Sequence, residues 1–139
     1  MGAWLPFIAF GVQTVVLGLF AFAWFSARSR EAKAMREAGV DPARCYRQTG
    51  GARLDLFNAT IPFARIIVTP SRITLACFGM SHVFDRSTVR SLSRHRGLFS
   101  TGLRIEHAKS SGPSFVVFWT SSFPKLAAAL ERFGWVVSK

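Results

Sequence analysis

The sequence predicts an anchored, mainly β protein: an N-terminal transmembrane helix, then an α+β domain of about seven antiparallel strands that form a barrel capped by a C-terminal helix. Three observations predict this class. An uncharged apolar run lies near the N-terminus, short strand-like runs follow residue 52, and the last segment has helical spacing of its apolar residues. With 139 residues, the chain has room for one modest domain and an appendage, but not for two cores.

The N-terminal apolar run, residues 3–25, contains no charged side chain and is long enough as a helix to cross a hydrocarbon layer of about 30 Å. Trp4 and Trp24 lie at its two ends, where indole rings prefer the membrane interfaces. A cleavable signal peptide is disfavoured, because the run lacks a basic leader and exceeds the usual length of about 7–15 apolar residues. Residues 1–25 are therefore predicted as a retained transmembrane anchor.

Charge on the two sides of this run predicts its orientation. Basic residues follow it closely, whereas the amino terminus is the sole positive charge before it. Because basic flanks stay on the cytoplasmic side, we expect a single-pass protein of the inner (plasma) membrane with its C-terminal domain in the cytoplasm. The basic residues are Arg28, Arg30, Lys33 and Arg36.

One arc of the predicted anchor helix carries small side chains, which let a second helix approach closely. This face is a candidate for packing against a second copy of the chain or another membrane protein. It comprises Gly11, Thr14, Gly18 and Ala21.

Residues 26–51 are predicted to connect the anchor to the domain. The polar residues 26–38 continue as a helical stalk that Gly39 and the Asp41-Pro42 turn end. A linker containing Pro42, Gly50 and Gly51 then leads to a domain over residues 52–139.

Seven short segments of the domain alternate in polarity or are apolar throughout, as strands do. Turn residues separate them at spacings too short for intervening helices, which predicts an antiparallel sheet. The segments are 54–57, 64–68, 73–78, 82–84, 89–94, 103–107 and 115–120.

The final segment is predicted as an amphipathic helix. Ser121 or Ser122 can cap it, and Pro124 fits in its first turn. Its apolar face is expected to plug one end of the barrel, and a glycine at position 134 ends it. That face comprises Leu126, Leu130 and Phe133, with Trp119 and Phe123 nearby.

Seven strand-like runs followed by one amphipathic helix is the order of a pleckstrin-homology-like (PH-like) barrel. The strings NATIPFARIIVTPSRITLACFG, HVFDRSTVRSLSRHRG, GLRIEHAKSSGPSFVVFWT and LAAALERFGW resemble the bacterial PH-like domains of small membrane-anchored proteins. The resemblance covers residue 52 to the C-terminus. It implies a binding fold without a catalytic signature, and it names no ligand, because such domains differ in what they bind.

Catalytic groups are sparse. The acidic residues of the domain each stand alone in their segments, and His82 and His107 are the histidines that neighbouring strands could bring together. A histidine in the wall of the barrel is the favoured interpretation of His107, since it continues the alternation of its strand. Cys45 and Cys77 are expected as isolated reduced thiols. We therefore expect a protein that is not an enzyme and that needs no metal or cofactor.

Positive charge is the remaining signal. Residues 52–139 contain 12 Lys or Arg and 4 Asp or Glu, a net charge of +8 out of +11 for the chain. Arginines cluster in one strand and the loop after it, which predicts a surface for phosphate groups, lipid headgroups above all. A generic solvated face carries equal weight, and nucleic acid ranks lower because no aromatic-plus-basic strand pattern is evident. The candidates are Arg86, Arg90, Arg94 and Arg96, with His95 among them.

The leading hypothesis is a non-enzymatic, membrane-tethered PH-like module at the cytoplasmic face that binds anionic lipid headgroups or a protein partner. A structural or accessory subunit of a membrane protein complex is the alternative. A small enzyme using His82 and His107 ranks last.

Overall fold

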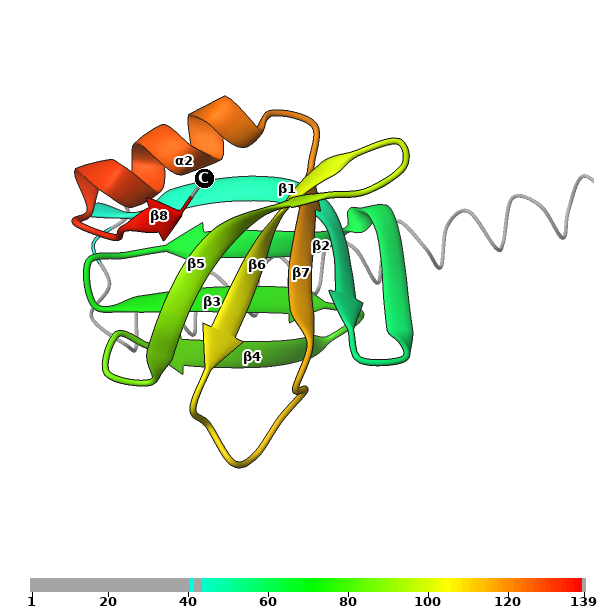
Figure 1. Ribbon diagram of the computed structural model, residues 1–139, viewed down its shortest axis with the longest axis horizontal. Coiled ribbons are helices and arrows are strands. Elements are labelled where there is room, and N and C mark those ends of the chain that lie inside the picture. Colours follow the sequence, from blue (N-terminus) through cyan, green and yellow to red (C-terminus); the bar gives the residue numbers. More distant parts are fainter. Residues whose placement is uncertain (1–40, 42–43, 139) are drawn as a thin grey trace, which may run out of the picture. The chain divides into compact units, whose positions relative to one another are not determined.

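The computed structural model describes residue 41 and residues 44–138. The chain divides into two compact units, residues 1–41 and 42–139, and the described strands and helix belong to the second. They form one curled sheet with one helix beside it (Figure 1). The elements are β1 (Tyr46–Leu54), β2 (Phe57–Val68), β3 (Arg72–Cys77), β4 (Met80–Asp85), β5 (Val89–Arg96), β6 (Thr101–His107), β7 (Val116–Thr120), α2 (Phe123–Arg132) and β8 (Val137–Ser138).

The sheet has the strand order β4-β3-β2-β1-β7-β6-β5-β8. Its pairs are antiparallel except for β5 and β8, which run parallel. β2, β3 and β4 cross β5, β6 and β7 steeply, so the sheet curls into a half-barrel (Figure 1). The domain is therefore β-rich, with one short helix in the described part of the chain.

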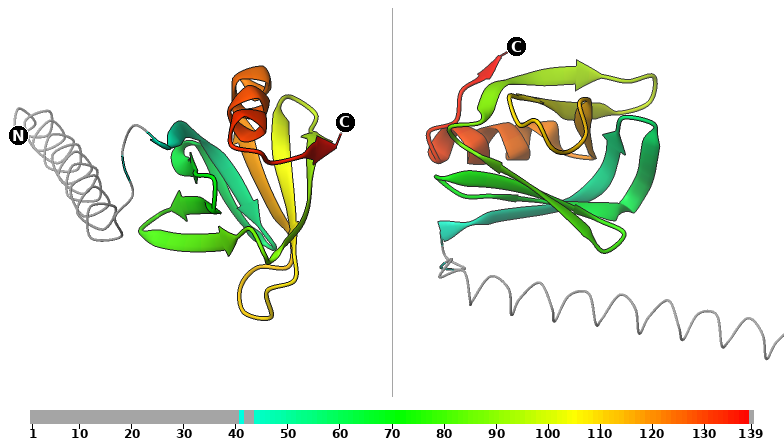
Figure 2. Two further views of the ribbon diagram at one scale, coloured as in Figure 1. Left: turned by 90° about the vertical axis from the view of Figure 1, so that its left-hand side faces the viewer. Right: turned by 90° about the horizontal axis from the view of Figure 1, so that it is seen from below.

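The predicted closed barrel of about seven strands is wrong. The described sheet has eight strands, and β4 and β8 occupy its two edges. Closure would require β4 to pair with β5, but the outer edge of β5 is taken by β8, where Leu92 pairs with Val137. The two-residue strand β8, which follows the helix in the chain, thus forms one edge of the sheet. α2 lies along one open end of the half-barrel (Figure 2).

The domain begins earlier than predicted, because β1 starts at Tyr46 and includes residues assigned to the linker. Gly50 and Gly51 are strand residues at a crowded crossing. A Cβ on Gly50 would collide with the carbonyl oxygen of Trp119 and lie 2.7 Å from the Phe118 ring. Glycine here permits close approach of two backbones, which composition alone does not distinguish from a flexible linker.

The β1–β2 turn lies inside the segment 54–57, which was predicted as one strand. Asp55 has a left-handed backbone with φ 52°, and Leu54 pairs with Phe57 across the turn. Asp is among the residues that adopt this conformation more readily than most. The prediction of a single strand at 54–57 is therefore wrong, and β2 begins at Phe57 instead of Ala64.

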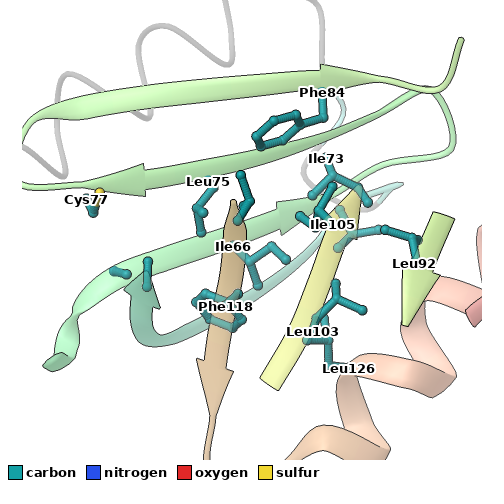
Figure 3. Close-up of a cluster of buried hydrophobic side chains, with 14 of the residues drawn as sticks. Ile66, Ile73, Leu75, Cys77, Phe84, Leu92, Leu103, Ile105, Phe118 and Leu126 are labelled. Carbon is teal, nitrogen blue, oxygen red and sulfur yellow. The ribbon is translucent and has the colours of Figure 1, made fainter. Parts of the chain in front are cut away.

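The core lies on the concave side of the half-barrel, where alternate side chains of the two groups of strands meet α2 (Figure 3). Burying one Leu, Ile or Phe side chain stabilises the fold by about 1.5–3 kcal/mol. The largest fully buried side chains include Ile66, Ile73, Leu75, Phe84, Leu92, Leu103, Ile105, Phe118, Leu126 and Leu130.

The end of α2 differs from the prediction. Phe133 follows the helix and is half-buried, while Trp135 is 5% exposed and completes the core. Gly134 between them has φ 79° and turns the chain back toward the sheet. The third plugging side chain is therefore Trp135, which lies beyond the helical spacing that singled out Phe133.

The predicted transmembrane anchor (residues 1–25), its small-residue face of Gly11, Thr14, Gly18 and Ala21, and the stalk (26–38) lie outside the described residues. Within residue 41 and residues 44–138, no helix is long and apolar enough to cross a membrane.

Candidate anion-binding groove

Strand β5 places two of the predicted arginines on the concave side of the sheet. Side chains alternate along a strand, so Arg94 and Arg96 share a face with the core residue Leu92. Both lie beyond the core toward the end of the strand and are exposed. The Arg94 guanidinium lies over the Phe123 ring of α2, 5.4 Å from its centroid. This cation–π contact favours an Arg94 side chain that points toward α2.

The two arginines line an open groove of about 630 Å³. No Asp or Glu is among the described residues that line it. Its walls come from the β5–β6 hairpin, the junction of β7 with α2, and the middle of β2. The remaining lining residues are Ile61, Gly97, Leu98, Phe99, Ser100, Thr101, Thr120, Ser121, Phe123 and Pro124.

The loop of the β5–β6 hairpin beside the groove is stabilised by its own backbone and by the Trp119 ring. The Gly97 amide donates a hydrogen bond to the carbonyl oxygen of Ser100 at 2.8 Å, which closes the turn. A Cβ on Gly97 would lie 3.0 Å from the Trp119 ring, so the loop backbone lies close against the indole. The loop is thereby supported on the side away from the groove.

Arg86 has a different role from the one predicted. Its guanidinium donates to the carbonyl oxygens of Pro70 at 2.8 Å, Phe133 at 3.2 Å and also Gly134. It also lies over the Trp135 ring, 4.9 Å from the centroid. Arg86 therefore satisfies carbonyl groups at the end of α2 and joins them to the β2–β3 turn, and it does not line the groove.

Arg90 is exposed at the opposite end of β5 from Arg96. It lies at a register shift between Val89 and Ser91, where the pairing with β6 is interrupted by one extra residue. Strand alternation therefore does not carry from Arg90 to Arg94, and of these three arginines only Arg94 and Arg96 share a face. The structure thus brings together Arg94 and Arg96 and leaves Arg86 and Arg90 elsewhere.

Of the two histidines of the enzyme hypothesis, His107 is held by hydrogen bonds within the fold. The Nδ1 atom of His107 accepts a hydrogen bond from the Lys109 amide at 3.2 Å, so Nε2 carries the proton and donates to the carbonyl oxygen of Pro113 at 2.8 Å. His107 thereby anchors the β6–β7 loop. His82 is half-buried on β4, opposite Leu75. Among the described residues, no group of three or more His, Cys, Asp or Glu is placed to hold a metal ion.

Cys77 is a core residue of β3, and burial raises the pKa of its thiol. A raised pKa lowers the thiolate fraction, so Cys77 is a poor nucleophile.

The convex face of the sheet carries an aromatic group that sequence reasoning missed. The His95 ring lies 5.4 Å from the Trp119 ring and 6.0 Å from the Phe115 ring, on the side opposite Arg94 and Arg96. Arg53 and Arg104 flank Phe115 at 5.5 and 5.4 Å from its centroid. The strand assignment of residues 115–120 was the available signal, because successive side chains of a strand point to opposite faces and Phe115 and Trp119 therefore point away from Phe118.

A second missed feature is a cluster of exposed aromatic rings on β2 and the β3–β4 turn. Phe78 stacks on Phe63 at 5.4 Å and meets Phe57 edge to face at 5.6 Å. The three residues are 41% (Phe57), 37% (Phe63) and 56% (Phe78) exposed. No pattern in the sequence brings these positions together.

Comparison of the chain with models of known protein families and with curated proteins finds no match.

Proposed function

We propose that this domain is a non-enzymatic binding module that docks on anionic lipid headgroups through Arg94 and Arg96. One observation carries the proposal: two exposed guanidinium groups share an open groove that no described carboxylate lines. Guanidinium groups bind phosphate oxygens in a bidentate way and stay charged at every physiological pH.

A membrane surface is the favoured source of phosphate. The residues after position 51 carry a net charge of +8, and each Arg or Lys near an anionic leaflet contributes about 1 kcal/mol of attraction. The apolar residues in the walls of the groove, among them Leu98 and Ile61, suit an interface with lipid better than a site for free phosphate in water.

We propose the PH-like character of the domain and its place at the membrane together with this function. The β-rich half-barrel is compatible with the PH-like resemblance. The basic residues that follow the apolar N-terminal run support a place at the cytoplasmic face of the plasma membrane. The hydrogen bonds of His107 support a binding role over a catalytic one, because they engage both ring nitrogens.

The test uses the full-length protein in nanodiscs of phosphatidylcholine, alone or with phosphatidylglycerol. Hydrogen exchange of the β5–β6 hairpin amides measures how much of the time the domain is docked. We expect slower exchange with the anionic lipid, in a way that added salt reverses. The variant Arg94→Gln/Arg96→Gln should lower the docking equilibrium constant roughly 30-fold, from about 1 kcal/mol per arginine.

The matched control is Arg72→Gln/Arg132→Gln, which removes the same charge from the ends of β3 and α2 that lie away from the groove. It should weaken docking much less. Equal weakening in the two double variants would mean diffuse attraction without a site. Unchanged exchange on addition of anionic lipid would reject headgroup binding.

The exposed aromatic cluster of Phe57, Phe63 and Phe78 favours a second candidate function, that of an accessory subunit bound to another protein. Soluble proteins seldom leave several apolar side chains together in water without a binding role. Affinity capture of the full-length protein and of Phe63→Ser/Phe78→Ser from native membranes tests it. A partner that the unchanged protein captures in repeated experiments and that the variant does not capture would support this candidate. Recovery of no partner with the unchanged protein would reject it.

A further inference from the structure

The β5–β6 hairpin ends in two apolar side chains that the described fold leaves uncovered. Leu98 is 94% exposed and Phe99 is 100% exposed. Each would remove a large apolar area from water if the tip entered an apolar phase, which is favourable. A turn needs neither residue for its geometry, since Gly97 and Ser100 close it through their backbone.

The hairpin presents this tip on a firm support. Arg96 pairs with Thr101 next to the loop, and Thr101 pairs in turn with Thr120 of β7. The Trp119 indole lies against Gly97 from behind. The tip therefore projects from the paired ends of three strands and does not depend on a long loop to reach its partner.

The surroundings of the tip are cationic and partly apolar. Arg94 and Arg96 line the groove beside it, and Ile61 on the opposite wall is 51% exposed. An arginine can lay its apolar stem along hydrocarbon while its guanidinium remains among phosphates. An apolar tip with cations set behind it is the arrangement of elements that lie in the interface of an anionic bilayer.

From this arrangement we infer that Leu98 and Phe99 insert below the headgroups of an anionic bilayer while Arg94 and Arg96 hold the phosphates above them. The inference rests on the proposed headgroup binding and adds a hydrophobic contact and an orientation to it. The open groove then faces the membrane, with the hairpin tip as the deepest point of the domain.

Insertion is measured with a nitroxide at position 98 of the full-length protein, in a Cys45→Ser/Cys77→Ala background and in the two kinds of nanodisc. Power saturation compares collisions with oxygen, which concentrates in hydrocarbon, and with a water-soluble nickel complex. With phosphatidylglycerol, the label at 98 should gain oxygen collisions and lose nickel collisions. A label at the exposed position 136, beyond α2, should remain water-like, as should both labels in phosphatidylcholine alone.

Two matched double variants test how much Leu98 and Phe99 contribute to docking on the membrane. Leu98→Ser/Phe99→Ser should weaken docking by at least about tenfold while its dependence on anionic lipid persists. Leu56→Ser/Val136→Ser removes two other exposed apolar side chains, which are 101% and 82% exposed, and should leave docking unchanged. Thermal melting of each variant checks the fold.

The outcomes separate the inference from the proposed function. A water-exposed label at 98, with hairpin amides still protected by anionic lipid, would overturn insertion and leave headgroup binding standing. Equal weakening by the two serine pairs would also overturn insertion. If anionic lipid protects no hairpin amide, headgroup binding fails and insertion fails with it.

Discussion

The indole N–H of Trp135 donates a hydrogen bond to the carbonyl oxygen of Thr69 at 2.8 Å. Both residues are buried, and they join the segment after α2 to the turn between β2 and β3, 66 positions away in the sequence. Arg86 adds its guanidinium to the same junction, over the Trp135 ring. The end of the helix is thus secured by the sheet as well as by its own apolar face.

Trp135→Ala should destabilise the domain by about 3–5 kcal/mol, because a large core side chain is replaced by a cavity. Trp135→Phe should cost about 1–3 kcal/mol, since the buried carbonyl of Thr69 then loses its donor. Denaturant titration followed by circular dichroism measures both values. Val136→Ala, at an exposed position, is the control, and a loss as large as that of Trp135→Ala would contradict the assignment.

Arg86→Lys should lower stability by about 1–3 kcal/mol without changing the docking on anionic lipid. A lysine ammonium lacks the planar fork of donors with which the arginine guanidinium reaches several carbonyl groups at once. Because the substitution keeps the charge, it separates the structural role of Arg86 from a general contribution of charge to lipid binding. Lost docking with unchanged melting would place Arg86 in the binding surface after all.

Gly50→Ala should lower the free energy of unfolding by about 1–3 kcal/mol or more, because the added Cβ would collide with the backbone of β7. Gly79 offers the comparison: its φ is 79°, but nothing lies within 4 Å of the position that a Cβ would occupy there. Gly79→Ala should cost about 1–2 kcal/mol from backbone strain alone. A smaller loss for Gly50→Ala than for Gly79→Ala would refute the close approach.

Asp55 should make the β6–β7 loop sensitive to acid. Its carboxylate accepts hydrogen bonds from the Ser114 hydroxyl at 2.7 Å, the Phe115 amide at 2.7 Å and the Ser114 amide at 3.1 Å. These bonds, that of the Ser114 hydroxyl above all, hold the pKa of Asp55 below its ordinary value of 3.8. The stabilisation is therefore complete above that ordinary value and is lost as the pH falls through the lower folded-state pKa.

The measurement is amide exchange at residues 114 and 115, corrected for intrinsic pH effects. Protection in the wild type should decrease as the pH falls below about 4, whereas Asp55→Asn should show weaker protection with little change over that range. An acid-induced decrease of equal size in the variant would assign the effect to another carboxyl group.

Local patterns were sufficient for part of the fold. Residues 73, 75 and 77 are apolar at every second position and form the core face of β3, and the spacing of Leu126 and Leu130 places both in the core. The closure of the sheet was not accessible in this way, because β8 is two residues long and carries no pattern of its own. Its pairing with Leu92 depends on where α2 brings the chain.

The candidate site was predicted to a similar extent. Clustering along the sequence pointed to Arg94 and Arg96, but it also included His95, which strand alternation places on the other face. It included Arg86, whose partners come from residues 70, 133 and 134 and are known only once the helix is packed. The contribution of Ile61 to the groove likewise depends on contact between β2 and a distant hairpin.

The register shift at Arg90 has a consequence for how β5 can vary. Val89 and Leu92 both contact the core although three positions separate them, a spacing that an uninterrupted strand would place on opposite faces. Arg90 is therefore an insertion between two stretches of strand that are in phase with the core. Its deletion should restore regular alternation, shorten β5 by one residue, and leave every other side chain of the strand on its present face.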